Sequence, residues 1–218
     1  MAFVLAVTNQ KGGVGKTTTA VNVAAQLANH NRRVMLVDLD PQGNATSSLG
    51  IDKSKLDRTL YDVLISQAKL SDIVLPTNTK NLFVLPANAD LAQAEIDLVD
   101  TPKREYKLKD ILAMVQADVI IIDCPPALGL LTVNALTVAD GVLIPVQAEY
   151  FALEGLSQLV QTIQLVKQGL NPELKVFGVV LTMLTKRMVL GEQVKAELET
   201  HFGDKLFKTV IPRNIRLA

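Results

Sequence analysis

The stretch FVLAVTNQKGGVGKTT, residues 3–18, decides the fold of this 218-residue chain. It begins with five apolar residues, Phe3–Val7, which predict a buried strand, and it continues into a loop that contains three glycines. A helical spacing of apolar residues follows, from about Lys16 to Ala28. A strand, a glycine loop and a helix in this order are typical of a phosphate-binding loop. Backbone N–H groups and the positive end of the helix there face an anion.

The loop departs from the general pattern G-x-x-x-x-G-K-[ST], because Gln10 stands where the first glycine is expected. A compact variant over Lys11–Thr18 keeps the same mechanics. Lys16 is predicted to contact the β- and γ-phosphates of a nucleotide, and the Thr17 hydroxyl to bind Mg²⁺. The alternative is a plain glycine turn with two solvated lysines. The strand before the loop and the helix after it argue against that alternative.

Further Val/Ile/Leu runs predict more strands, and most are continuous, as in a parallel sheet that is buried on both faces. Helical patterns lie between them, so the βαβ order predicts an α/β fold: an open, twisted, mostly parallel sheet with helices on both faces. Residues 47–80 are less regular and are interpreted as an excursion from the sheet, which leaves one domain over residues 1–218. The expected strands are Val34–Val37, Leu82–Leu85, Val119–Ile122, Gly141–Val146, Val176–Leu181 and Leu206–Ile211.

The composition excludes several classes of protein. With 49% apolar and 20% charged residues the chain is neither disordered nor a disulfide-stapled miniprotein. The start lacks the features of an export signal, and no apolar run reaches the roughly 18 residues that cross a bilayer, so a cytoplasmic protein is expected. The net charge is zero, but residues 1–160 carry −4 and residues 161–218 carry +4. Any nucleic-acid binding would therefore come from a local patch.

Acidic residues stand at the ends of two expected strands. Asp38 and Asp40 emerge from the second strand, and Asp123 ends the run Val119–Ile122. A carboxylate in the position of Asp123 is costly unless a cation or donors meet it, and a water bound to Mg²⁺ would do so. Other interpretations stay open here. Asp38 or Asp40 could cap a turn at Pro41, and Asp123 could cap a helix that starts near residue 128.

The lone cysteine and the two histidines predict no site. Cys124 is interpreted as a small buried apolar residue, and one cysteine is too few for an iron–sulfur cluster of the kind that two cysteines per subunit hold. His30 and His201 have no metal-ligand spacing around them, so surface or capping positions are expected.

Four stretches together resemble the ParA/MinD family of deviant Walker A ATPases, most of all its Soj-like, chromosome-partition branch. They are Lys11–Thr18, DLDPQGN at 38–44, IIIDCPP at 120–126 and Pro212–Asn214. The resemblance extends from residue 3 to about residue 217. Family members usually continue further, so the chain is expected to lack the family's C-terminal end.

The resemblance assigns roles to individual residues. Lys11 is expected to reach the nucleotide of a partner subunit, Lys16 to contact the phosphates, and Asp40 to position the attacking water; these three are the expected catalytic residues. Magnesium is expected at Thr17, Asp38 and Asp123. Arg187 and Arg216 are the expected DNA-binding residues. The expected ATP-binding residues are Lys11, Gly12, Gly13, Val14, Gly15, Lys16, Thr17, Thr18, Pro212 and Asn214.

The resemblance also implies a function. ATP and Mg²⁺ would drive formation of a homodimer that binds non-specific DNA. Slow ATP hydrolysis, stimulated by a ParB-like protein, would release the DNA and drive chromosome or plasmid partition. Such a protein is expected in the cytoplasm on the nucleoid, without stable membrane insertion. The alternatives are a MinD-like membrane-associated positioning ATPase and a dethiobiotin-synthetase-like ligase.

Overall fold

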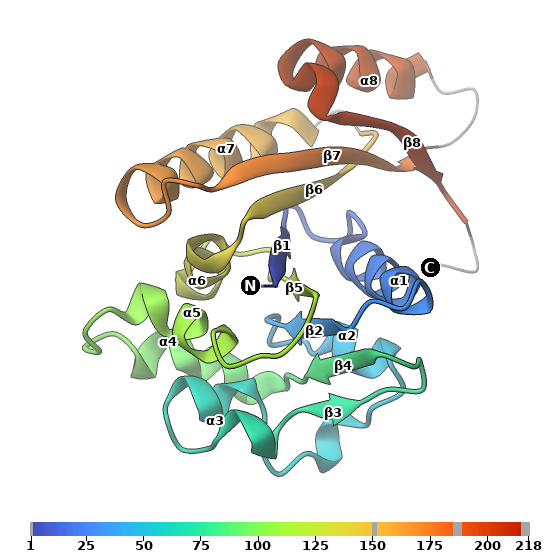
Figure 1. Ribbon diagram of the computed structural model, residues 1–218. Helices are drawn as coiled ribbons and strands as arrows, with labels where there is room; N and C mark the ends of the chain where they lie inside the picture. Colours follow the sequence, from blue (N-terminus) through green and yellow to red (C-terminus); the bar gives the residue numbers. More distant parts are fainter. Residues whose placement is uncertain (1, 150–151, 185–188, 215–218) are drawn as a thin grey trace.

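The chain folds around one sheet. The computed structural model describes residues 2–149, 152–184 and 189–214, except the side chains of 152–154, 189–190 and 192. Within them, strands follow the order β3-β4-β2-β5-β1-β6-β7-β8, and only β3 runs antiparallel to its neighbour (Figure 1). The strands are β1 (Phe3–Val7), β2 (Val34–Asp38), β3 (Leu75–Pro76), β4 (Leu82–Leu85), β5 (Val119–Asp123), β6 (Gly141–Gln147), β7 (Lys175–Leu184) and β8 (Leu206–Pro212).

Helices cover both faces of the sheet, as the sequence predicts (Figure 1). Helices α1 and α2 pack on one face, and α3 to α8 pack on the other. None of the described helices is long and apolar enough to cross a membrane. The helices are α1 (Lys16–Asn29), α2 (Asn44–Ser48), α3 (Leu60–Leu64), α4 (Ala94–Asp97), α5 (Lys107–Leu112), α6 (Leu130–Val138), α7 (Ala152–Gly169) and α8 (Val189–Phe202).

The central strands are apolar on both sides because both sides are covered. In β1, Val4 and Ala6 belong to the core beneath α3 to α8, whereas Leu5 and Val7 belong to the core beneath α1. Burial on both faces explains why these runs are continuous rather than alternating. The parallel arrangement also brings the carboxyl ends of β1, β2 and β5 together at one edge.

The excursion over residues 47–80 differs in one respect from the prediction. It contains short helices, but it also contains β3, whose Leu75 pairs with Val84 of β4 at the edge of the sheet. A two-residue strand is too short to show a pattern. Its second residue is Pro76, which lacks an N–H and is tolerated only at such an edge.

Candidate active site

The glycine loop lies between β1 and α1, at the carboxyl edge of the sheet. Gly13 and Gly15 have φ angles of 74° and 87°, a left-handed conformation that glycine adopts without strain. Gly15 is the N-cap of α1, so the loop curls directly into the positive end of that helix. The Lys16 ammonium crosses the loop and donates to the Lys11 carbonyl at 3.1 Å.

Lys16 is buried among carboxylates. Burial lowers its pKa, and the negative charges of Asp123 and Asp40 act in the opposite direction. A lysine in this setting is a fixed positive charge with little water around it. Such a charge binds an anionic oxygen more strongly than a solvated lysine does.

Polar side chains of neighbouring strands hold the loop in place. Asn9 donates from Nδ2 to the carbonyl of Pro145 in β6 at 2.7 Å, and its Oδ1 accepts from the Lys11 N–H at 3.0 Å. The Thr182 hydroxyl of β7 donates to the Val14 carbonyl at 2.8 Å. The loop is therefore preorganised by β6 and β7 as well as by its own glycines.

Three carboxylates gather beside the loop. Asp38 and Asp123 are partners in the β2–β5 register. The two oxygens of Asp38 accept from the Asp40 N–H at 3.3 Å, and from the Thr46 N–H at 2.8 Å and hydroxyl at 2.7 Å. Asp40 Oδ1 accepts from the Gln42 N–H at 2.9 Å, so Asp40 does cap the turn at this point.

Asp123 is the exception among the three. Its side chain is fully buried, and neither of its oxygens makes a hydrogen bond with the described part of the chain. Burial raises its pKa to about 7, although the neighbouring Thr17 hydroxyl and the Lys16 charge oppose the rise. Burial likewise raises the pKa of Asp38 to about 6.

The helix-capping interpretation of Asp123 is wrong. Helix α6 begins at Leu130, and the carboxylate at its start comes from another element. Glu95 of α4 accepts from the Leu131 N–H at 3.3 Å. The Asp123 carboxylate itself makes no hydrogen bond with the described residues.

A cavity of about 100 Å³ opens beside the loop, where α1 meets the ends of β7 and β8. The cavity brings Pro212 and Asn214, from the far end of the sequence, next to Gly15 and Thr18 of the glycine loop. It is lined by Gly15, Thr18, Thr19, Thr182, Met183, Ile211, Pro212, Arg213 and Asn214.

Comparison with known proteins reveals the family. Residues 2–176 match the AAA domain family. The chain is 57% identical over 220 residues to the sporulation initiation inhibitor protein Soj of Bacillus subtilis, covering all of this chain and 87% of that protein. It is 52% identical over 217 residues to the chromosome partitioning protein ParA of Myxococcus xanthus, covering 99% and 77%. The chain belongs to the ParA/MinD family, in its Soj-like branch.

Solved structures agree with this family and its P-loop fold. Cobyrinic acid a,c-diamide synthase from Mycobacterium smegmatis, with bound ADP and magnesium, has a TM-score of 0.93 at 44% identity, covering 98% of this chain and 88% of that one. A putative plasmid partition protein of Borrelia burgdorferi, bound to AMPPNP, has a TM-score of 0.87 at 25% identity, covering 100% and 87%.

The structure of this ParA/MinD member brings most of the predicted site residues together. Lys11 to Thr18, Asp38, Asp40 and Asp123 share the carboxyl edge of the sheet, and the cavity with Pro212 and Asn214 adjoins them. Their individual roles stay predictions. Arg187 and Arg216, the predicted DNA-binding residues, lie outside the described residues.

Sequence reasoning missed the side chains that support these residues. Thr46 holds Asp38, Asn9 and Thr182 hold the loop, and Glu149 lies 2.7 Å from the Lys11 ammonium. One signal was present for Glu149. It follows β6, the strand next to β1, and strand ends on one side of a parallel sheet meet at the same edge.

The residues present fit a magnesium ion that is completed by phosphate oxygens. Mg²⁺ is usually held by one or two carboxylates together with substrate phosphates and waters. The unpartnered oxygens of buried Asp123 and the nearby Thr17 hydroxyl can supply oxygen ligands of this kind. Within the described residues, no three His, Cys, Asp or Glu side chains are arranged to hold a metal by themselves.

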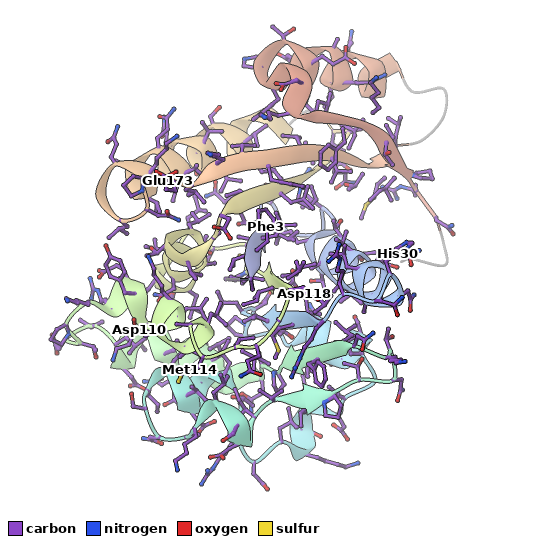
Figure 2. The ribbon with its side chains drawn as sticks, in the orientation of Figure 1. Phe3, His30, Asp110, Met114, Asp118 and Glu173 are labelled. Atoms are coloured by element: carbon purple, nitrogen blue, oxygen red, sulfur yellow. The ribbon has the colours of Figure 1, made fainter. Side chains whose placement is uncertain are left out.

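The cysteine and histidines occupy the positions expected of them. Cys124 is fully buried, and burial raises the pKa of its thiol. His30 is exposed at the end of α1, away from the glycine loop (Figure 2). His201 is exposed near the end of α8, with Nδ1 2.8 Å from the Glu197 carbonyl oxygen.

We expect Gly43→Ala to destabilise the chain by about 2 kcal/mol or more. Gly43 has a φ of 59°, and an added Cβ would lie 2.6 Å from the Ala87 carbonyl oxygen, which belongs to the backbone and cannot move aside cheaply. Urea unfolding measures the change. Gly155→Ala is the control, since a Cβ there meets nothing within 4 Å and alanine favours the helix. Equal midpoints for Gly43→Ala and the parent chain would show that this loop is not tightly packed.

We expect Asp123→Asn to stabilise the nucleotide-free chain at alkaline pH. The folded-state pKa of Asp123 is raised from 3.8 to about 7, so its contribution to stability is fully present below about pH 4 and is lost as the pH rises through 7. At pH 8 the variant should melt at least about 5 °C above the parent chain, and the difference should vanish below about pH 4. Thermal melting in EDTA measures this. An equal difference at both pH values would contradict an uncompensated carboxylate.

Proposed function

We propose that the chain is an ATP-driven switch in chromosome or plasmid partition, which dimerises on ATP, binds non-specific DNA as the dimer and releases it on hydrolysis. Its likeness to Soj and ParA along the whole chain supports a role in partition. The two lysines and three carboxylates at one sheet edge support ATP binding and hydrolysis at that edge.

The position of the Lys11 ammonium gives this proposal its main support. Lys16 already supplies the positive charge within the loop, where its ammonium lies across the backbone. The Lys11 ammonium is instead directed to Glu149 and is partly exposed, so it can reach beyond its own loop. A second positive charge that arrives only with a partner subunit would stabilise charge in the transition state, as an arginine finger does.

Residues along the carboxyl edge of the sheet would each bind one part of the nucleotide. The N–H groups of the glycine loop and Lys16 would hold the phosphates, and Thr17 and Asp123 would hold Mg²⁺, with Asp38 supporting the waters around the ion. Mg²⁺ would supply neutralisation of charge on the β- and γ-phosphates. The cavity lined by Pro212 and Asn214 takes the adenine.

Hydrolysis requires an oriented water. The Gln42 N–H fixes one oxygen of Asp40, and Oδ2 makes no hydrogen bond with any described residue. That oxygen would accept a proton from the attacking water and align it on the γ-phosphorus, while the bond to the β–γ bridging oxygen breaks to give ADP and phosphate. Turnover is slow until a ParB-like protein stimulates it.

DNA binding would come from basic residues near the end of the chain, Arg187 and Arg216 among them. Residues 161–218 carry a net charge of +4 within a neutral chain, which is modest for one subunit. Two subunits double the number of phosphate contacts, and affinity for DNA rises steeply with that number. Dimerisation can therefore turn DNA binding on, and the protein would be found on the nucleoid in the cytoplasm.

Lys11→Ala tests the proposal. We expect the variant to bind ATP within about threefold of the parent chain, but to lose ATP-dependent dimerisation by at least about tenfold and to hydrolyse ATP more slowly. Isothermal titration measures the binding, and sedimentation velocity with AMPPNP measures the dimer. Lys80→Ala, which removes an exposed lysine elsewhere, is the matched control. Full dimerisation of Lys11→Ala would refute the crossing role.

A ligase is the second candidate, because one structural neighbour is described as cobyrinic acid a,c-diamide synthase. A ligase consumes ATP only with its organic acid substrate, whereas a partition switch needs none. We expect ATP hydrolysis without any organic acid and no increase on addition of cobyrinic acid. A strict requirement for that acid would establish the ligase instead.

A further inference from the structure

An ion pair joins the glycine loop to the segment that follows β6. The Lys11 ammonium lies 2.7 Å from Glu149 Oε2 in the same chain. The other carboxylate oxygen, Oε1, accepts from the Gln147 Nε2 at 2.6 Å. Glu149 is therefore fixed from a second side, and it presents one defined oxygen to Lys11.

Both ends of this contact are built on β6. The base of the loop is anchored there through the buried hydrogen bond from Asn9 to Pro145. Glu149 follows two residues after β6 ends at Gln147. Lys11 and the Arg213 charge both lower the pKa of Glu149, with the Lys11 hydrogen bond the larger cause. Arg213 also lines the cavity beside the glycine loop.

We propose that Glu149 holds Lys11 within its own chain before nucleotide binds, and that this contact must break for Lys11 to cross to a second copy. The proposal rests on the proposed function, in which Lys11 contacts the partner's nucleotide. Glu149 is a positioning residue here, because it acts through Lys11 and does not touch the nucleotide.

The strength of the contact suits a reversible hold. The side chains of Lys11 and Glu149 are 31% and 47% exposed, so water screens the pair and its contribution is about 1 kcal/mol or less. That corresponds to about a two- to fivefold bias toward the held position. The phosphates of ATP carry more negative charge than one carboxylate, so they can draw the lysine away.

Symmetry doubles the effect on dimerisation. A two-fold dimer breaks one Lys11–Glu149 contact in each subunit. Removing both contacts beforehand should therefore tighten the dimer by the square of the single bias, about four- to 25-fold. If Glu149 instead contributed to the dimer interface, its removal would weaken the dimer.

The first arm of the test examines the contact in the nucleotide-free chain. Acetylation of lysines by N-hydroxysuccinimide acetate is followed by mass spectrometry, with exposed Lys80 of the same chain as reference. Glu149→Gln should raise the rate at Lys11 about two- to fivefold. Glu199→Gln is the control, since it removes an exposed carboxylate 3.8 Å from Lys195 on α8 and should leave Lys11 unchanged. An unchanged Lys11 rate in Glu149→Gln overturns the proposal.

The second arm measures the AMPPNP-dependent dimer by sedimentation velocity. Glu149→Gln should dimerise about four- to 25-fold more tightly than the parent chain, and Glu199→Gln should match the parent. A weaker dimer overturns the proposal, because Glu149 would then stabilise the interface. If neither protein dimerises, the proposed function fails and the crossing step fails with it. The acetylation rates still show in that case whether the contact within the chain exists.

Discussion

Lys16→Ala is expected to weaken ATP binding by about a hundredfold. The ammonium is buried at the mouth of the glycine loop, 3.1 Å from the Lys11 carbonyl oxygen, where it would meet the β- and γ-phosphates. A charge-assisted hydrogen bond in a buried site contributes about 1.5–3 kcal/mol, and two phosphate oxygens share this donor. Isothermal titration with ATP and Mg²⁺ measures the affinity.

The same variant separates binding from folding. Burial lowers the pKa of Lys16, so removing the charge relieves a desolvation cost in the nucleotide-free chain. We therefore expect Lys16→Ala to remain folded by circular dichroism. Lys55→Ala, which removes an exposed lysine paired with Asp52, is the control. Unaltered ATP affinity in a folded Lys16→Ala would place the phosphates elsewhere.

Asp40→Ala is expected to slow ATP hydrolysis by about 10²- to 10³-fold and to change ATP affinity by less than about threefold. The position of Asp40 explains why hydrolysis should be affected more than ATP affinity. Asp40 lies beside Lys16 with one oxygen fixed by Gln42, so it can align a water but adds only negative charge toward the phosphates. Single-turnover hydrolysis, measured at saturating protein, isolates the chemical step.

The matched control for this loss is Asp57→Ala, which removes an exposed carboxylate from the surface. It should leave the rate unchanged. Asp40→Ala should also trap the ATP-bound dimer, because the step that ends that state is the one removed. Hydrolysis within threefold of the parent rate would assign the water to another residue.

The sheet could be predicted because burial on both faces makes most of its strands continuous runs of apolar residues. Each strand from β1 to β8, apart from β3, begins within one residue of the predicted run. The two-residue β3 could not be predicted, because Pro76 argues against a strand and only the pairing with β4 makes these residues one.

The motifs predict that Lys16, Asp40 and Asp123 lie at one edge of the sheet, but they do not predict contacts between residues that are far apart in the sequence. Lys16, Asp40 and Asp123 follow strands whose ends must meet. The contact between Lys11 and Glu149 joins residues 138 apart, and no local pattern encodes such a distance. The capping interpretation of Asp123 failed for the same reason, because Glu95 reaches α6 from a separate helix.

An ATP-dependent DNA switch should retain DNA in one nucleotide state and release it in the others. A long DNA fragment without a specific site is incubated with the chain and Mg²⁺ plus ATP, plus ADP or without nucleotide, at about 50 and 200 mM salt. We expect DNA to be retained with ATP but not with ADP or without nucleotide. Retention should fall by at least about tenfold between the two salt concentrations, as for multiple phosphate contacts. Equal retention with ATP and ADP, or none with ATP at low salt, would contradict an ATP-dependent DNA switch.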